Sequence, residues 1–172
     1  MLIVRGNHEG DPEPDADLKT IVVPVDGSPL AESVIPHVTA LAKALDLKVT
    51  LLRVVPTVEE FSSHTDYQRL DGVVGLHFKT SEDMAKEAAD KALVYLKELE
   101  NTLRKEGVAL VDHRLVRGGA ANIIIDIAQE TPDNLVAMTT HGRSGPARWT
   151  LGSVADRVVR HSGDPVLVVR TG

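Results

Sequence analysis

Glycine and serine residues follow an apolar stretch near the end of the chain, in a pattern that could bind an anion. Leu135–Met138 is apolar without polar alternation, as is typical of a strand covered on both faces. Gly142, Gly145 and Gly152 come next, and Ser153 opens a segment with apolar residues at helical spacing. Glycines let the backbone approach a ligand closely, and the N–H groups and dipole of a helix N-terminus attract negative charge. The pattern therefore predicts a phosphate site in this loop.

Other kinds of reactive site find little support in the sequence. The absence of cysteine excludes disulfides, thiolate metal sites and cysteine nucleophiles. Neither the G-x-x-x-x-G-K-[ST] phosphate loop, nor G-x-G-x-x-G after the first strand, nor a G-x-S-x-G serine motif is present. The seven histidines show no metal-ligand spacing, and no nucleophile with a neighbouring base can be assigned. Dedicated catalysis is therefore not expected.

The composition narrows the class of partner. The formal net charge is -6, and aromatic residues make up 3% of the chain, which argues against extended contact with nucleic acid. No apolar run approaches the roughly 20 residues of a membrane helix. Met1–Val4 is too short for the apolar core of a signal peptide. We therefore expect a cytoplasmic protein with no nucleic-acid or membrane partner.

The elements that must position the loop alternate along the chain. Runs rich in apolar residues are predicted as strands at 21–25, 48–55, 108–116, 135–138 and 165–170, the third being more polar and therefore an edge. Helices are predicted at 28–45 with a kink at Pro36, at 80–106 with a capping box at Thr80 and Asp83, from Gly119 to near Pro132, and from Ser153 to the stop at Gly163.

This alternation specifies the fold class. We predict an α/β fold with a five-stranded parallel, doubly wound, Rossmann-like sheet and helices on both faces. Ligands of such sheets bind at the carboxyl ends of the strands. The turns after Val25, Val54 and Met138 are therefore the candidate places.

Two segments fall outside the pattern. Residues 1–17 alternate acidic residues with proline and glycine, so we expect a disordered tail before a single domain at 18–172; Leu2–Val4 docking as an edge strand is the alternative. Residues 56–80 show no clear periodicity, and they hold Phe61, Tyr67 and Phe78. They are expected to form an irregular surface excursion, with a lid or binding loop as the alternative.

Several motifs together resemble the universal stress protein family. The resemblance rests on the spans His141–Gly145, Leu151–Val154 and Pro165–Val169, with support from Pro24–Ser28 and Val116–Ala121, and it covers residues 18–170. ATP-binding members carry G-x-x-G, nine residues, then G-[ST]. Here Gly142, nine intervening residues and Gly152–Ser153 match the second half.

The chain departs from that signature at its first glycine, where it has Thr139. Threonine has a Cβ and restricted χ1 rotation, but its hydroxyl could donate a hydrogen bond to a phosphate.

The resemblance implies roles for particular residues. Asp26 and Val25 would lie by the ribose and adenine, and the backbone at Val54 would contact the adenine edge. Gly142, Gly152, Ser153 and Val154 would hold the phosphates. The complete implied set is Pro24, Val25, Asp26, Val54, Met138, Thr139, His141, Gly142, Arg143, Gly152, Ser153 and Val154. The ligand would be ATP, or ADP or AMP, with Mg²⁺ and no metal ligand from protein side chains.

The family also implies a regulator that forms homodimers. An ATP-binding stress-response regulator with at most slow ATP hydrolysis is expected, acting on an unidentified protein partner. A member without nucleotide that acts by protein contacts alone, and a nucleotide-dependent enzyme, are the alternatives. The last strand is expected at an open sheet edge where it pairs with its own copy through Val166, Leu167, Val168 and Val169, unless the tail or residues 56–80 cover that edge.

Overall fold

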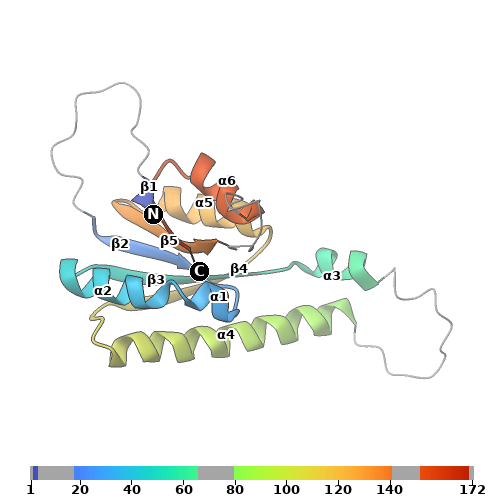
Figure 1. Ribbon diagram of the computed structural model, residues 1–172. Coiled ribbons are helices and arrows are strands. Elements are labelled where there is room, and N and C mark those ends of the chain that lie inside the picture. Colours follow the sequence, from blue (N-terminus) through green and yellow to red (C-terminus); the bar gives the residue numbers. More distant parts are fainter. Residues whose placement is uncertain (1, 4–17, 66–79, 141–151, 171–172) are drawn as a thin grey trace.

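The computed structural model describes residues 2–3, 18–65, 80–140 and 152–170, and within them six strands form one sheet (Figure 1). The order across the sheet is β1-β6-β5-β2-β3-β4. Strands β2 to β6 pair in parallel, whereas β1 pairs with β6 in the antiparallel direction. The predicted five-stranded parallel sheet is therefore confirmed, with one short strand added. The bounds are Leu2–Ile3 for β1, Thr20–Pro24 for β2, Lys48–Val55 for β3, Val111–Arg117 for β4, Asn134–Thr140 for β5 and Val166–Arg170 for β6.

Helices cover both faces of the sheet, as predicted (Figure 1). Helices α2 and α4 pack on one face and α5 and α6 on the other, each over its own apolar cluster. Successive side chains of β2 point to opposite faces of the sheet, so the strand contributes to both clusters. Ile21 and Val23 belong to one cluster, and Val22 to the other. The helices of the described residues are α1 Pro29–Glu32, α2 Ile35–Leu45, α3 Val58–Thr65, α4 Ser81–Lys105, α5 Ala120–Glu130 and α6 Ser153–His161.

The helix predicted at 28–45 is in fact two helices. Helix α1 ends at Glu32 and α2 begins at Ile35, so the chain breaks where only a kink was expected. Pro36 lies in the first turn of α2, where the missing N–H of proline removes no internal hydrogen bond. A break is therefore the less strained solution than a proline inside a continuous helix.

Capping side chains fix the start of the long helix α4. Thr80 Oγ1 accepts the N–H of Asp83 at 3.1 Å, and Asp83 Oδ2 accepts the N–H of Thr80 at 3.2 Å. The predicted capping box is thus confirmed.

A similar box starts α3, which the absence of periodicity after residue 56 had hidden. The Thr57 N–H donates to Glu60 Oε2 at 2.8 Å, and the Glu60 N–H donates to Thr57 Oγ1 at 3.3 Å. The irregular excursion expected at 56–80 is therefore wrong for Val58–Thr65, which forms a helix beside α4 (Figure 1). Residues 66–79 lie outside the described residues.

The N-terminus and the C-terminal strand meet at one side of the sheet. Leu2 lies opposite Leu167 and Ile3 opposite Val166. The expected disorder is thus wrong for these two tail residues, and the alternative of a docked edge strand is the correct one; residues 4–17 lie outside the described residues. The expected open edge at the last strand is also corrected, because β1 pairs there. At the opposite side, the prediction that the third predicted strand forms an edge is confirmed by β4.

A buried polar pair lies where β5 begins. Asn134 is 2% exposed, and its amide donates to Ala128 O at 2.9 Å and Thr131 O at 2.7 Å. Burial raises the pKa of Asp164, and the adjacent Asn134 offsets this only in part. Asn134 Oδ1 and Asp164 Oδ2 are both buried and accept no hydrogen bond from the described residues. A buried carboxylate oxygen without a donor is unfavourable when the carboxyl group is ionised.

We therefore expect Asp164→Asn to stabilise the fold at neutral pH by about 1 kcal/mol, since a neutral amide avoids burying an ionised oxygen that has no donor. The folded-state pKa of Asp164 lies above its ordinary value of 3.8, so its ionisation disfavours folding as the pH rises through and beyond that value. The gain should accordingly be largest near pH 7 and small near pH 4. Urea unfolding at both pH values measures it, with exposed Asp126→Asn as the control. A variant less stable than the wild type at pH 7 would contradict this assignment.

Candidate functional site

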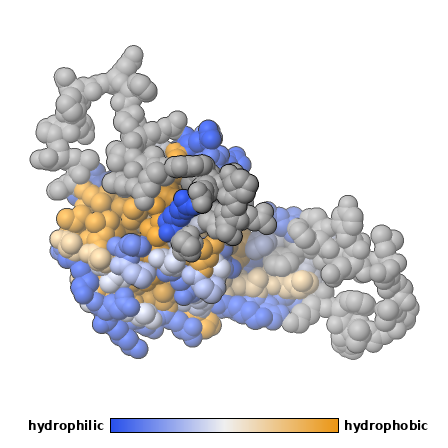
Figure 2. All heavy atoms as spheres, in the orientation of Figure 1, coloured by the Kyte–Doolittle hydropathy of each residue, from blue (hydrophilic) through white to orange (hydrophobic). Residues whose placement is uncertain are grey.

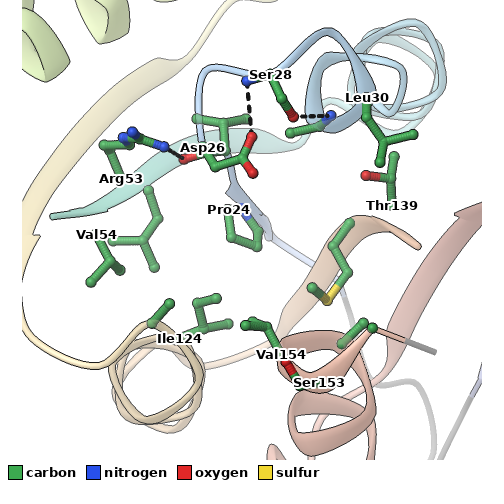
Figure 3. A pocket seen from close by; sticks show the side chains of 17 residues that line it. Pro24, Asp26, Ser28, Leu30, Arg53, Val54, Ile124, Thr139, Ser153 and Val154 are labelled. Carbon is green, nitrogen blue, oxygen red and sulfur yellow. Dashed lines mark hydrogen bonds between the residues drawn. The ribbon is translucent and has the colours of Figure 1, made fainter. Parts of the chain in front are cut away.

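A pocket of about 320 Å³ lies at the carboxyl ends of β2, β3 and β5 (Figure 3). Strand β2 is followed in the chain by β3 on one side and pairs with β5 on the other, so the strand order reverses here and the flanking helices diverge. The described residues that line the pocket are Pro24, Val25, Asp26, Ser28, Leu30, Ala31, Leu52, Arg53, Val54, Ala120, Ile124, Met138, Thr139, Gly152, Ser153, Val154 and Ala155.

Most of the residues singled out from the sequence meet at this pocket. The three candidate turns converge on it, and its lining includes Pro24, Val25, Asp26, Val54, Met138, Thr139, Gly152, Ser153 and Val154. His141, Gly142 and Arg143 lie outside the described residues.

Asp26 supplies the negative charge of the pocket. It is exposed, and its Oδ1 accepts the N–H of Ser28 at 2.9 Å (Figure 3). Partial loss of hydration raises the pKa of Asp26, but the hydrogen bonds from Ser28 and the charge of Arg53 outweigh this and hold the pKa below its ordinary value. The carboxylate is therefore ionised at neutral pH and can act only as an acceptor.

Arg53 is a site residue that the sequence analysis missed. Its Nη1 donates to the carbonyl oxygen of Val25 at 3.3 Å, which ties β3 to the turn after β2 (Figure 3). The signal was a guanidinium inside an otherwise uncharged run, because Arg53 is the one charged residue between Val49 and Val55. A charge in a strand covered on both faces needs a partner, and here a turn at the pocket provides it.

Two helices begin at the pocket without a capping side chain. The N-caps of α5 and α6 are Gly119 and Gly152, and neither helix has a side-chain cap among the described residues. Ser153 is the first residue of α6 and not its N-cap, so its hydroxyl does not cap the start of the helix. The first-turn N–H groups of α6 therefore offer donors and a partial positive charge at the pocket.

Apolar side chains form much of the remaining wall. Val54, Ile124 and Val154 lie along one side of the pocket, and Thr139 lies near Leu30 on another (Figure 3). Sequence analysis did not select the lining residues Ser28, Leu30, Ala31, Leu52, Ala120, Ile124 and Ala155. Ile124 lies in the helix predicted from Gly119 to near Pro132, but helical periodicity gives the buried face of a helix and not the part of that face that borders a cavity.

In the part of the chain that the structure describes, no group of three or more histidine, aspartate or glutamate side chains could hold a metal ion. None of the described helices is long and apolar enough to span a membrane.

Comparison with known proteins identifies the family. The model of the universal stress protein family matches residues 17–170. The chain belongs to the universal stress protein family. Universal stress protein MJ0531 of Methanocaldococcus jannaschii is 31% identical over 156 residues, which cover 88% of this chain and 82% of that protein.

Solved structures show the same fold. Protein MJ0577 of Methanocaldococcus jannaschii has a TM-score of 0.68 and 26% identity, covering 90% of this universal stress protein and 96% of that chain. A universal stress protein of Archaeoglobus fulgidus, solved in complex with dAMP, has a TM-score of 0.56 and 21% identity, covering 88% and 96%.

Ser28 links the start of α1 to the pocket and can be tested directly. Its Oγ accepts the N–H of Ala31 at 3.1 Å, so Ser28→Ala should reduce the unfolding free energy by about 1 kcal/mol, as the loss of an N-cap usually does. Ser28→Thr keeps the acceptor and should lose less. Urea unfolding of both variants decides this, and equal losses would show that the cap contributes nothing.

Proposed function

We propose that this universal stress protein binds an adenine nucleotide in the pocket, ATP with ADP or AMP as alternatives, and acts in the cytoplasm as a stress-response regulator without dedicated catalysis. The observation that carries the proposal is that apolar walls, an ionised carboxylate and uncapped helix N-termini line one cavity. A nucleotide needs each of these: a wall for its base, an acceptor for its sugar hydroxyls and donors for its phosphate.

Each part of the nucleotide has a chemically matched part of the pocket. The apolar side chains of Val54, Ile124 and Val154 suit the faces of a planar base (Figure 3). Asp26 suits the ribose hydroxyls, because an ionised carboxylate accepts from O–H donors. The first turn of α6, which begins at Ser153, suits the phosphate.

Thr139 replaces the first signature glycine, and its place in the pocket has opposing effects on nucleotide binding. It lies at the pocket with its hydroxyl-bearing side chain near Leu30 (Figure 3). The side chain occupies space that a glycine would leave open, while the hydroxyl adds one donor. A Mg²⁺ ion would be held chiefly by the phosphates of the nucleotide, as is usual for this ion.

The fold has a precedent for this ligand class in the dAMP complex of the Archaeoglobus fulgidus protein. Regulation rather than catalysis is supported by the chemistry of the walls. Among the described lining residues there is no histidine, and the carboxylate of Asp26, whose pKa lies below its ordinary value, is too weakly basic to activate a nucleophile. Without a base beside a nucleophile, hydrolysis of a bound nucleotide should be slow. A protein-interaction module that binds no nucleotide is the alternative.

Closing the pocket with a side chain tests the proposal. Ala120 lines the pocket at the start of α5, so we expect Ala120→Phe to weaken ATP binding at least tenfold by filling the cavity. The next residue, Ala121, has similar partial exposure but is not among the lining residues, so Ala121→Phe is the matched control.

Calorimetry with ATP measures both variants, after circular dichroism has shown that each is folded. Mass spectrometry of small molecules released from the denatured wild type identifies the nucleotide. Absence of binding by the folded wild type would favour the protein-interaction module instead.

We also propose a homodimer that uses the C-terminal strand in exchange with β1. Leu167 and Val169 are partly buried, and the space-filling view shows apolar residues on the side where β1 and β6 lie (Figure 2). Since β1 pairs with β6 at Leu167 and Val166, a second copy competes with β1 for that stretch of the strand. Val166 and Val168 are 1% and 3% exposed, so they are core residues and not suitable probes of pairing.

Removing the backbone donors of β1 should therefore favour the dimer. In the full chain, replacing both Leu2 and Ile3 by proline abolishes two N–H groups and weakens the pairing of β1. We expect a higher dimer fraction than in the wild type by light scattering at micromolar concentration. Replacing both residues by valine keeps the N–H groups and serves as the control. A double-proline variant with an unchanged dimer fraction would contradict the exchange.

A further inference from the structure

A cluster of charged and hydroxyl groups lies behind the pocket, on the opposite side of β3 from the apolar walls. Arg53 and Val54 are neighbours in β3, so their side chains leave the strand on opposite faces. Val54 packs with the α5 and α6 layer, whereas Tyr95 of α4 packs with the other layer. Arg53 reaches back to the turn after β2, where it donates to Val25 O and lines the pocket. It is therefore shared between the ligand cavity and the core.

The cluster is not internally satisfied. Arg53 Nε is buried without a hydrogen-bond partner among the described residues, whereas the buried hydroxyl of Tyr95 interacts with the carboxylate of Glu32. Burial and the nearby carboxylates of Glu32 and Asp26 raise the pKa of Tyr95, while Arg53 acts in the opposite direction. Packing alone would favour an apolar side chain at position 53, since buried polar groups without partners are destabilising. A guanidinium at this position thus indicates a role at the pocket.

We propose that Arg53 is a positioning residue of the nucleotide site. By holding the turn at Val25 and facing Asp26 with its positive charge, it fixes Asp26 as the acceptor for the ribose hydroxyls. The site therefore selects ribonucleotides over nucleotides whose sugars lack those hydroxyls. This inference rests on the proposed adenine nucleotide binding and names the specificity of that same pocket.

Arg53 is well suited to this role because it is the one cation among the described lining residues. Among the described lining residues, Asp26 and Arg53 are the charged ones. The lining residues of β5, α5 and α6 carry no titratable side chain, and from α1 and α4 the groups facing the cluster are Glu32 and Tyr95. The Ser28 N–H donates to Asp26 Oδ1, and the exposed carboxylate keeps acceptor capacity for a ligand.

The test compares AMP with 2′,3′-dideoxyadenosine monophosphate, which differ only in the two sugar hydroxyls. For the wild type at pH 7, calorimetry should give a preference for AMP of roughly tenfold to a hundredfold, as expected for hydrogen bonds to a charged acceptor. Asp26→Asn should reduce that preference strongly. Arg53→Met should reduce it at least severalfold while changing the affinity for the dideoxy compound little, and Arg53→Lys should restore part of it.

A pH series separates positioning from a merely structural effect. The AMP preference should fall as the pH drops through the pKa of Asp26, and in Arg53→Met this midpoint should move to higher pH because the positive charge is gone. Arg114→Met, on the exposed side of β4, is the matched control and should leave preference and midpoint unchanged.

The contrary outcomes are distinct. An Arg53→Met protein that keeps the preference and the midpoint of the wild type would overturn the inference, as would an equal loss of affinity for both ligands. A wild type that binds both compounds equally overturns the inference alone. A wild type that binds neither overturns the proposed function, and the inference with it.

Discussion

Burial of the sheet on both faces is the constraint on which the rest of this structure depends. Strands β2, β3 and β5 lie between two layers of helices, and Ile21, Val22 and Val23 are each 0% exposed. Such strands have little room for polar side chains along their length. The charged and hydroxyl groups of the pocket consequently lie towards the strand ends and at the helix starts that face them. The pocket lies where these meet, at the reversal of strand order.

Much of the fold could be predicted because burial leaves a direct mark on the sequence. Uninterrupted apolar runs identified the central strands, and the bounds predicted for the second of them, 48–55, are those of β3. Elements with weaker marks were less predictable. Helix α3 has few apolar residues to reveal its period, although Thr57 and Glu60 carry its capping signal. Strand β1 has only Leu2 and Ile3, and its pairing with β6 is a long-range contact that no local pattern encodes.

Only part of the candidate site could likewise be predicted from the sequence. Asp26, Gly152 and Ser153 were accessible from motifs, because turns and helix starts need particular residue types. Arg53 and Ala120 were not, since they reach the pocket through the relative placement of β3, the turn after β2 and α5. Motif reasoning finds the residues that make local backbone geometry, and tertiary packing decides which others share the cavity. The apolar walls belong to the second group.

The helices differ in how their first-turn N–H groups are satisfied, and this difference bears on the proposed phosphate site. Helices α1 and α4 satisfy their first-turn N–H groups with the side chains of Ser28 and Thr80, whereas α5 and α6 start from Gly119 and Gly152 without a side-chain cap among the described residues. A glycine at the N-cap lowers stability by only roughly a few tenths of a kcal/mol relative to a serine or threonine. A ligand phosphate at the first turn of α6 would supply the missing acceptor, while the carboxylate of Asp26 repels it from the other part of the cavity. The charges of the pocket would therefore impose one orientation on the proposed nucleotide, whose phosphate would complete a helix start that has no side-chain cap among the described residues.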